Sequence, residues 1–174
     1  PVLTSGQQER KSKQRKIRNS EYYDMEGTFD RLYAESKKDK TFNHLMEIIE
    51  SEENIKLAYR TIKKNTGSDT SGVDKRTIAD LAKLSEEEYV RLIRKQFSNY
   101  HPRPVRRVEI PKPNGKTRPL GITTIVDRIV QQCILQVMEP ICEAKFYEHS
   151  YGFRPCRSAE NAISYAYGLA QRNK

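Results

Sequence analysis

Pairs of apolar residues recur every four positions between residues 125 and 142, and they constrain the fold more than any other feature. The pairs are Ile125/Val126, Ile129/Val130, Cys133/Ile134, Val137/Met138 and Ile141/Cys142. A four-residue repeat keeps them on one side of an α-helix, and the doublets make that side broad. We therefore predict a long helix that other elements cover on more than one side. Pro140 lacks a backbone N–H, so it either kinks this helix or begins a new one.

Apolar spacing and capping residues predict further helices before and after this one. The first runs from Tyr22 to about Ser36, and the predicted N-terminal caps of the others are Thr41, Ser51, Ser85 and Ser158. Glu88 follows Ser85 at the spacing of a capping box, in which each side chain bonds the other residue's backbone N–H. Residues 65–74 are rich in Gly, Ser, Thr and Asp, which indicates a loop.

Residues 105–110 and 117–122 carry the one convincing β pattern. Asn114 and Gly115 between them favour a type I′ hairpin turn. Ideal alternation from that turn pairs position 112 with position 117, which places Lys112 and Arg118 on opposite faces. Pro111, Pro113 and Pro119 indicate edge strands. The fold class is therefore α+β, mostly helical with one β-hairpin.

The net charge of +9 is concentrated at the two ends of the chain. Residues 1–20 hold six basic residues against one acidic, residues 21–100 hold 14 against 16, and residues 101–174 hold 12 against 6. We predict three parts: a basic, disordered arm (1–20), a helical region (21–100), and a hairpin with helices (101–174). The positive excess indicates a polyanionic partner, most often nucleic acid. The arm cations either contact RNA or only keep the chain in solution; they are Arg10, Lys11, Lys13, Arg15, Lys16 and Arg18.

Several classes of protein are excluded by what the sequence lacks. No apolar run is long enough to span a membrane, and residues 1–20 contain no signal-peptide core. Cys133, Cys142 and Cys156 form no CxxC pair or zinc pattern, which is typical of reduced thiols in a cytoplasmic protein. The sequence shows no Walker loop, no GxGxxG and no HExxH or GxSxG motif. We therefore expect no cofactor, no metal site and no complete catalytic site in this chain.

Two basic segments are candidates for binding. The hairpin places five cations against one acidic residue, Glu109; the cations are Arg106, Arg107, Lys112, Lys116 and Arg118. Such a ribbon suits phosphate oxygens, although lysines on a solvated edge strand are also a common guard against aggregation. In residues 150–157, Phe153 lies beside Arg154 and Arg157. Aromatic rings next to arginine grip unpaired bases, whereas the alternative is a helix start with a buried Phe153.

The same segments resemble a known family. VRRVEIPKPNGKTRPLGI (105–122) and the following TTIVDRIVQQCILQVMEPICEAKFYEHSYGFRPCRSAENAI (123–163) resemble the first and second polymerase blocks of group II intron reverse transcriptases, also called maturases. Residues 32–78 resemble the N-terminal extension that precedes those blocks. The likeness spans about residues 30–165, with three blocks in order. It implies the fingers subdomain of a right-hand reverse transcriptase.

The resemblance also implies roles for single residues. Lys112 of the IPKP segment and Arg118 of the RPLG segment match residues that reach the phosphates of the incoming nucleotide. The segments Gly72-Val73-Asp74 and Gly152–Pro155 match parts that lie near the template. With these we group Arg106, Arg107, Lys116, Phe153, Arg154 and Arg157 as template or RNA contacts. Intron RNA is expected at the basic arm and at Lys63 and Lys64.

The sequence departs from this family where chemistry would occur. Reverse transcriptases hold two Mg²⁺ ions on palm aspartates, but this sequence has no Asp-Asp pair and no Asp after Asp127. We expect fingers without a palm, so that the parent protein would be an RNA-directed DNA polymerase using Mg²⁺ and a DNA primer. This chain would bind template and intron RNA without polymerising. The alternative is a non-catalytic RNA-binding splicing cofactor. A separate hypothesis is assembly, in which the stripe at 125–142 packs on the palm in the parent protein or on a second copy of this chain, giving a homodimer.

Overall fold

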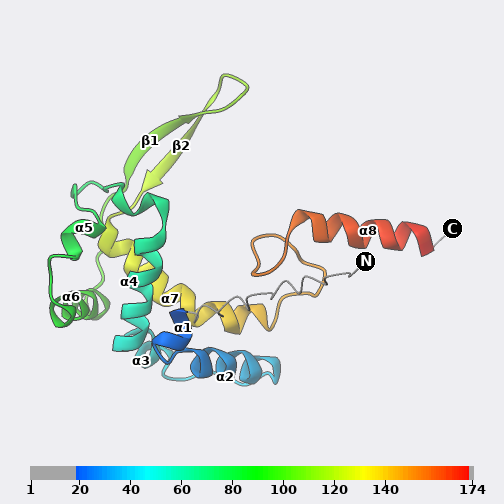
Figure 1. The fold of residues 1–174 in the computed structure, drawn as a ribbon, viewed down its shortest axis with the longest axis horizontal. Helices are drawn as coiled ribbons and strands as arrows, with labels where there is room; N and C mark the ends of the chain where they lie inside the picture. The colour runs from blue at the N-terminus through cyan, green and yellow to red at the C-terminus, as the bar shows by residue number, and fades with distance from the viewer. Residues whose placement is uncertain (1–18, 173–174) are drawn as a thin grey trace, which may run out of the picture.

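The computed structural model describes residues 19–172, and its centre is the long helix predicted from the apolar doublets. This helix is α7 (Ile125–Glu143), and it contacts α2 (Glu26–Lys37), α3 (Leu45–Ile49), α4 (Glu52–Lys64) and α6 (Glu86–Ser98) (Figure 1). Coverage on more than one side is therefore confirmed. The helix continues through Pro140, so no new helix begins there.

The hydrophobic core contains the first residue of the first four doublets, whereas Ile141 of the fifth is only partly buried. Ile125, Ile129, Cys133 and Val137 are completely buried, together with Ile55 of α4 and Ile93 of α6. Burying a side chain of this size contributes about 1.5–3 kcal/mol. The other side of α7 remains open, because Ile134, Leu135 and Met138 are 41%, 51% and 36% exposed.

The helix starts are built largely as the capping residues predict. Ser51 accepts a hydrogen bond from the Asn54 N–H at 3.2 Å, and Ser158 accepts one from the Asn161 N–H at 3.3 Å. The capping box of Ser85 and Glu88 is also formed. The prediction for Thr41 is wrong, since α3 starts after His44, whose left-handed backbone (φ 61°) sets the helix start three residues later.

Three short helical segments complete the N-terminal half. They are α1 (Asn19–Tyr22), the 3-10 turn η1 (Thr66–Asp69) and α5 (Ile78–Leu81). The predicted helix from Tyr22 to Ser36 is interrupted, because Asp24 has a positive φ of 55° and α2 begins only at Glu26. The loop predicted at 65–74 contains η1 and is otherwise irregular.

A buried polar network fixes α4 against α7. The Asn54 side-chain amide donates to the Ile49 carbonyl at 2.9 Å and to the Cys133 carbonyl at 3.0 Å. The Gln136 side chain returns a hydrogen bond to Asn54 Oδ1 at 2.8 Å. Since Asn54 is completely buried, its polar atoms are satisfied only if the two helices keep this register.

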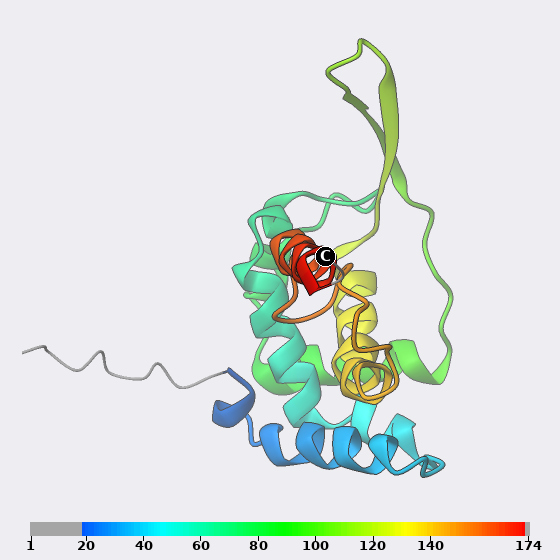
Figure 2. The same ribbon diagram turned by 90° about the vertical axis from the view of Figure 1, so that its right-hand side faces the viewer.

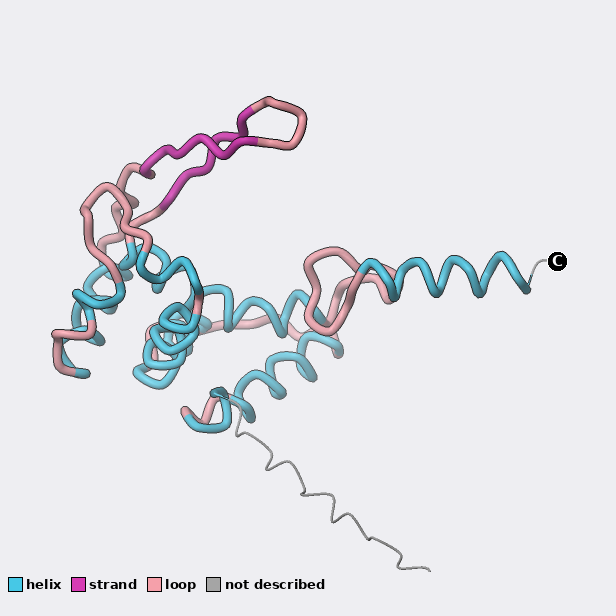
Figure 3. The backbone as a smooth tube through the Cα atoms, turned by 45° about the horizontal axis from the view of Figure 1, so that its top comes forward, coloured by secondary structure: helices cyan, strands magenta, loops and turns pink. Residues whose placement is uncertain are grey.

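The hairpin consists of β1 (Arg106–Pro111) and β2 (Thr117–Ile122) and projects from the helices (Figures 1 and 3). Its turn is not type I′. The Lys112 N–H donates to the Lys116 carbonyl and the Gly115 N–H to the Lys112 carbonyl, so the loop has three residues, and Gly115 alone has a positive φ. A two-residue turn would need an N–H from Pro113, which proline lacks.

This longer loop shifts the register by one residue from the predicted pairing. Pro111 now pairs with Thr117, and Ile110 pairs with Arg118. Lys112 lies two positions beyond Ile110, so alternation places it on the same face as Arg118. The expectation that Lys112 and Arg118 lie on opposite faces is therefore wrong.

The last helix, α8 (Ala159–Arg172), stands apart from the others. It extends away from the helices around α7, beyond the loop that follows that helix (Figures 1 and 3), and it has no buried residue. Within residues 19–172, no helix is both long and apolar enough to cross a bilayer. The three cysteines are free thiols, and burial raises the pKa of Cys133 to about 12.

Candidate nucleic-acid interface

One face of the hairpin gathers four of its five cations. The cross-strand pairs on this face are Arg106/Ile122, Val108/Leu120, Ile110/Arg118 and, at the tip, Lys112/Lys116. The face therefore has a guanidinium at its base, apolar residues in the middle and three cations toward the tip. Arg107 lies on the other face, where its Nε is 3.3 Å from the Glu109 carboxylate. A count of charges in the sequence could not separate Arg107 from the rest.

The cations near the tip are open to solvent. Every residue from 111 to 120 is exposed. Across residues 19–172, no acidic side chain lies within ion-pair distance of Lys112, Lys116 or Arg118. Exposed cations without an acidic partner are available to form charge-assisted hydrogen bonds with an incoming anion.

The base of the hairpin is joined to the 65–74 loop by two arginines. Arg106 Nε donates to the Ser71 carbonyl at 2.9 Å. Arg128 of α7 donates to the Gly67, Thr70 and Thr123 carbonyls at 2.5 to 3.1 Å. Burial lowers the pKa of Arg128. Arg128 was not predicted as a site residue, because a lone arginine in an apolar stripe is typical of a solvated position.

The predicted template segment Gly72–Asp74 lies at this junction. A Cβ on Gly72 would stand 2.8 Å from the Thr124 Cα, so the loop can approach α7 this closely only with glycine. Val73 is exposed, whereas the side chain of Asp74 is nine-tenths buried, 3.6 Å from Arg103 Nη1. Asp74 Oδ2 accepts no hydrogen bond from the described residues.

The 150–157 loop separates its two arginines. Arg154 is buried, and its guanidinium donates to Glu143 and to the Tyr147 and Ser150 carbonyls. Phe153 is fully exposed, so the alternative of a buried Phe153 is wrong. Its backbone is left-handed, with a φ of 55°.

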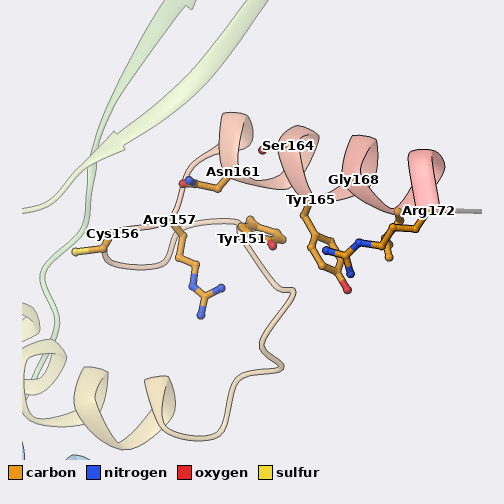
Figure 4. A pocket seen from close by; sticks show the side chains of 9 residues that line it. Tyr151, Cys156, Arg157, Asn161, Ser164, Tyr165, Gly168 and Arg172 are labelled. Atoms are coloured by element: carbon orange, nitrogen blue, oxygen red, sulfur yellow. The ribbon is translucent and has the colours of Figure 1, made fainter.

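Arg157 instead lines a cleft of about 450 Å³ between this loop and α8 (Figure 4). Tyr151, Asn161, Tyr165 and Arg172 also line it. None of these four residues was predicted from the sequence as a site residue. Positions 161, 165, 168 and 172 recur at helical spacing on one side of α8, and this periodicity is the signal that could have identified them.

The residues predicted to contact intron RNA are only partly within the described region. Lys63 and Lys64 are exposed at the end of α4, which lies at the same end of the helices as the hairpin base (Figures 1 and 2). Lys63 Nζ lies 5.8 Å from the Tyr59 ring centroid. The arm residues 10–18 are outside the described residues. Between residues 19 and 172, no three His, Cys, Asp or Glu side chains are grouped so as to hold a metal ion.

Comparison with known proteins gives several relatives, most of which are named for introns. Protein YkfC of Escherichia coli K12 is 44% identical over 123 residues, 68% of this chain and 32% of YkfC. The group II intron-encoded protein LtrA of Lactococcus lactis is 34% identical over 128 residues, 72% of this chain and 21% of LtrA. A COX1/OXI3 intron 1 protein of Saccharomyces cerevisiae is 29% identical over 138 residues, 78% of this chain and 16% of that protein. No family model matches. The chain thus spans a third or less of each of these relatives.

Proposed function

This chain is homologous to the group II intron-encoded proteins, and on that premise we propose that it is the RNA-gripping fingers portion of a reverse transcriptase and maturase. In this proposal the hairpin contacts phosphates of RNA and of the incoming nucleotide. Intron RNA contacts the base of the hairpin together with Lys63 and Lys64 at the end of α4. The polymerase activity, its Mg²⁺ and its DNA primer would belong to the whole protein.

The observation that carries the proposal is the register of the hairpin. It places Arg106, Lys112, Lys116 and Arg118 on one face and leaves Arg107 on the other. The distance between successive phosphates on a strand is similar to the spacing of side chains along a β-ribbon, so several cations on one face can contact one strand. A face with cations on both strands suits the branched oxygens of a triphosphate equally.

The contacts at the base of the hairpin support this role, because they hold the hairpin in one orientation relative to the helices. Arg106 and Arg128 together bond four carbonyls: those of Gly67, Thr70 and Ser71 in the 65–74 loop, and that of Thr123. A hydrogen bond from a charged donor contributes about 1.5–3 kcal/mol, and less where solvent reaches it, as at the Gly67 and Thr70 carbonyls. The hairpin can therefore present its cations at a constant angle to the helices.

The test is the salt dependence of RNA binding by single variants of the 174-residue chain. Each phosphate contact on a single strand contributes about −0.7 to the slope of log K against log salt. Lys112→Ala, Lys116→Ala and Arg118→Ala should each weaken binding several-fold and reduce the magnitude of the slope by about 0.7. Arg107→Ala is the matched control on the opposite face and should leave the slope unchanged. Equal slope changes for all four variants would refute a role for the face.

A further inference from the structure

We propose that the cleft between the 150–157 loop and α8 is a second RNA subsite, one that holds an unpaired base. The inference rests on the proposed RNA binding but concerns a different surface. The hairpin face is a set of cations around apolar residues, whereas the cleft is lined by aromatic rings and arginines.

Two aromatic rings form the cleft (Figure 4). In that view the ring of Tyr151 lies between Arg157 and Tyr165, and Arg172 reaches back toward Tyr165 from the end of α8. The Arg157 guanidinium is 5.6 Å from the Tyr151 ring centroid. Rings held next to guanidinium groups bind bases by stacking and the neighbouring phosphates by charge.

Contacts with His149 hold the Tyr165 ring in place. Its ring stacks on His149 with centroids 4.0 Å apart and planes at 17°, and its hydroxyl shares a 2.9 Å hydrogen bond with His149 Nε2. Tyr147 packs edge-on against His149 in turn, at 5.3 Å. Because these contacts already restrict the Tyr165 ring, it loses little conformational entropy when a base stacks on its other face.

The remaining lining suits the edge and the phosphate of a nucleotide. Asn161 and Ser164 offer hydrogen-bonding groups, and none of the nine described lining residues is acidic. At Gly168 a Cβ would meet nothing within 4 Å, so this turn of α8 leaves space in the cleft. The volume of about 450 Å³ lies within the range of small-ligand sites.

The experiment uses the 174-residue chain and a single-stranded RNA of about twelve nucleotides with a central 2-aminopurine, since binding sites of this type cover roughly 4–16 nucleotides. The fluorescence of 2-aminopurine falls when the base stacks on an aromatic ring. We expect quenching on binding, and Tyr165→Leu should abolish it and weaken binding about five- to 150-fold, the range of one lost base–aromatic stack. Tyr165→Phe keeps the ring and should retain the quenching.

The chain offers matched controls. Tyr167→Leu changes an exposed tyrosine on the same helix that does not line the cleft, and it should leave quenching and affinity unchanged. Gly168→Leu adds a side chain where a Cβ meets nothing within 4 Å, and it should block the base even if Tyr165→Leu alters the fold. Gly27→Leu, at an equally open glycine of α2, controls for the added side chain.

The outcomes separate this inference from the proposed function. Lys112→Ala should weaken binding but leave the quenching of the bound RNA intact, whereas the cleft variants should remove the quenching. Full quenching in both Tyr165→Leu and Gly168→Leu would refute the proposed subsite without affecting the role proposed for the hairpin face. Displacement of the RNA signal by adenosine monophosphate at equal concentration would assign the cleft to a free nucleotide and also overturn it.

Discussion

The guanidinium of Arg154 is held by the carboxylate of Glu143, with Nη2 2.6 Å and Nε 3.0 Å from its oxygens. Nη1 donates to the Tyr147 and Ser150 carbonyls at 2.6 and 2.8 Å, so all three nitrogens bond within the chain. Arg154 therefore joins the end of α7 to the loop that leads into α8. This structural role differs from the one proposed for Arg157, although the two residues are close in sequence.

We predict that Arg154→Met lowers the melting temperature more than it weakens RNA binding. The hydrogen bond from Arg154 lowers the pKa of Glu143 in the folded protein. A carboxylate with a lowered folded pKa adds stability above its unfolded pKa of about 4.3, and that stability is lost as pH falls through the folded value. The difference in melting temperature between wild type and variant should thus be full at neutral pH and shrink on acidification. Circular dichroism melts across this range measure it.

Arg107→Met is the control for that prediction. Its partner Glu109 is exposed, so the pair contributes little stability at any pH. A pH-independent difference for Arg154→Met would contradict the role given to Glu143.

Gly72→Ala should loosen the 65–74 loop from α7. Its Cβ would stand 2.8 Å from the Thr124 Cα and 2.9 Å from the Thr124 nitrogen, so backbone must shift. Overpacking of this kind costs about 1–3 kcal/mol of unfolding free energy. Urea denaturation measures the loss. Gly67→Ala in the same loop meets nothing within 4 Å and should leave the free energy nearly unchanged, and equal losses would show that close packing at Gly72 is not the cause.

The hairpin illustrates what the sequence predicts and where it fails. Alternation and the Asn114-Gly115 signal were enough to locate both strands within a residue. The register was wrong because the turn rule concerns the two central residues, whereas the outcome depended on Pro113, which cannot donate the N–H that a two-residue turn uses. One missing hydrogen bond moved every pair by one position and brought Lys112 onto the face of Arg118.

The site was less predictable than the fold, because contacts between distant segments decide it. Burial of Arg154 depends on Glu143, eleven residues earlier, and the fixing of the 65–74 loop depends on Arg106 and Arg128. Ser158 was predicted to begin a helix, but that prediction did not indicate that α8 buries no residue. Its cleft-lining side was therefore overlooked.

Asn54→Leu should destabilise the pairing of α4 with α7, although it adds apolar surface. It would leave the Ile49 and Cys133 carbonyls without the amide that donates to them, and the Gln136 amide without the oxygen that accepts from it. Each buried polar group left unpaired costs about 1–3 kcal/mol. We expect a lower denaturation midpoint with RNA binding at the hairpin retained below that midpoint. A midpoint equal to that of wild type would show that water replaces the lost bonds.

Lys112→Ala should affect nucleotide use more than RNA binding once the chain is joined to the remaining part of a homologous intron-encoded protein. RNA spans several cations, so loss of one lowers its affinity only several-fold. An incoming triphosphate is small and would depend on Lys112 and Arg118, which share one face of the hairpin. Primer extension should show KM for nucleotide rising by a larger factor than the Kd for RNA. Arg107→Ala, on the opposite face, should change neither. Equal factors for both quantities in Lys112→Ala would remove the nucleotide role and leave the hairpin as an RNA-binding element.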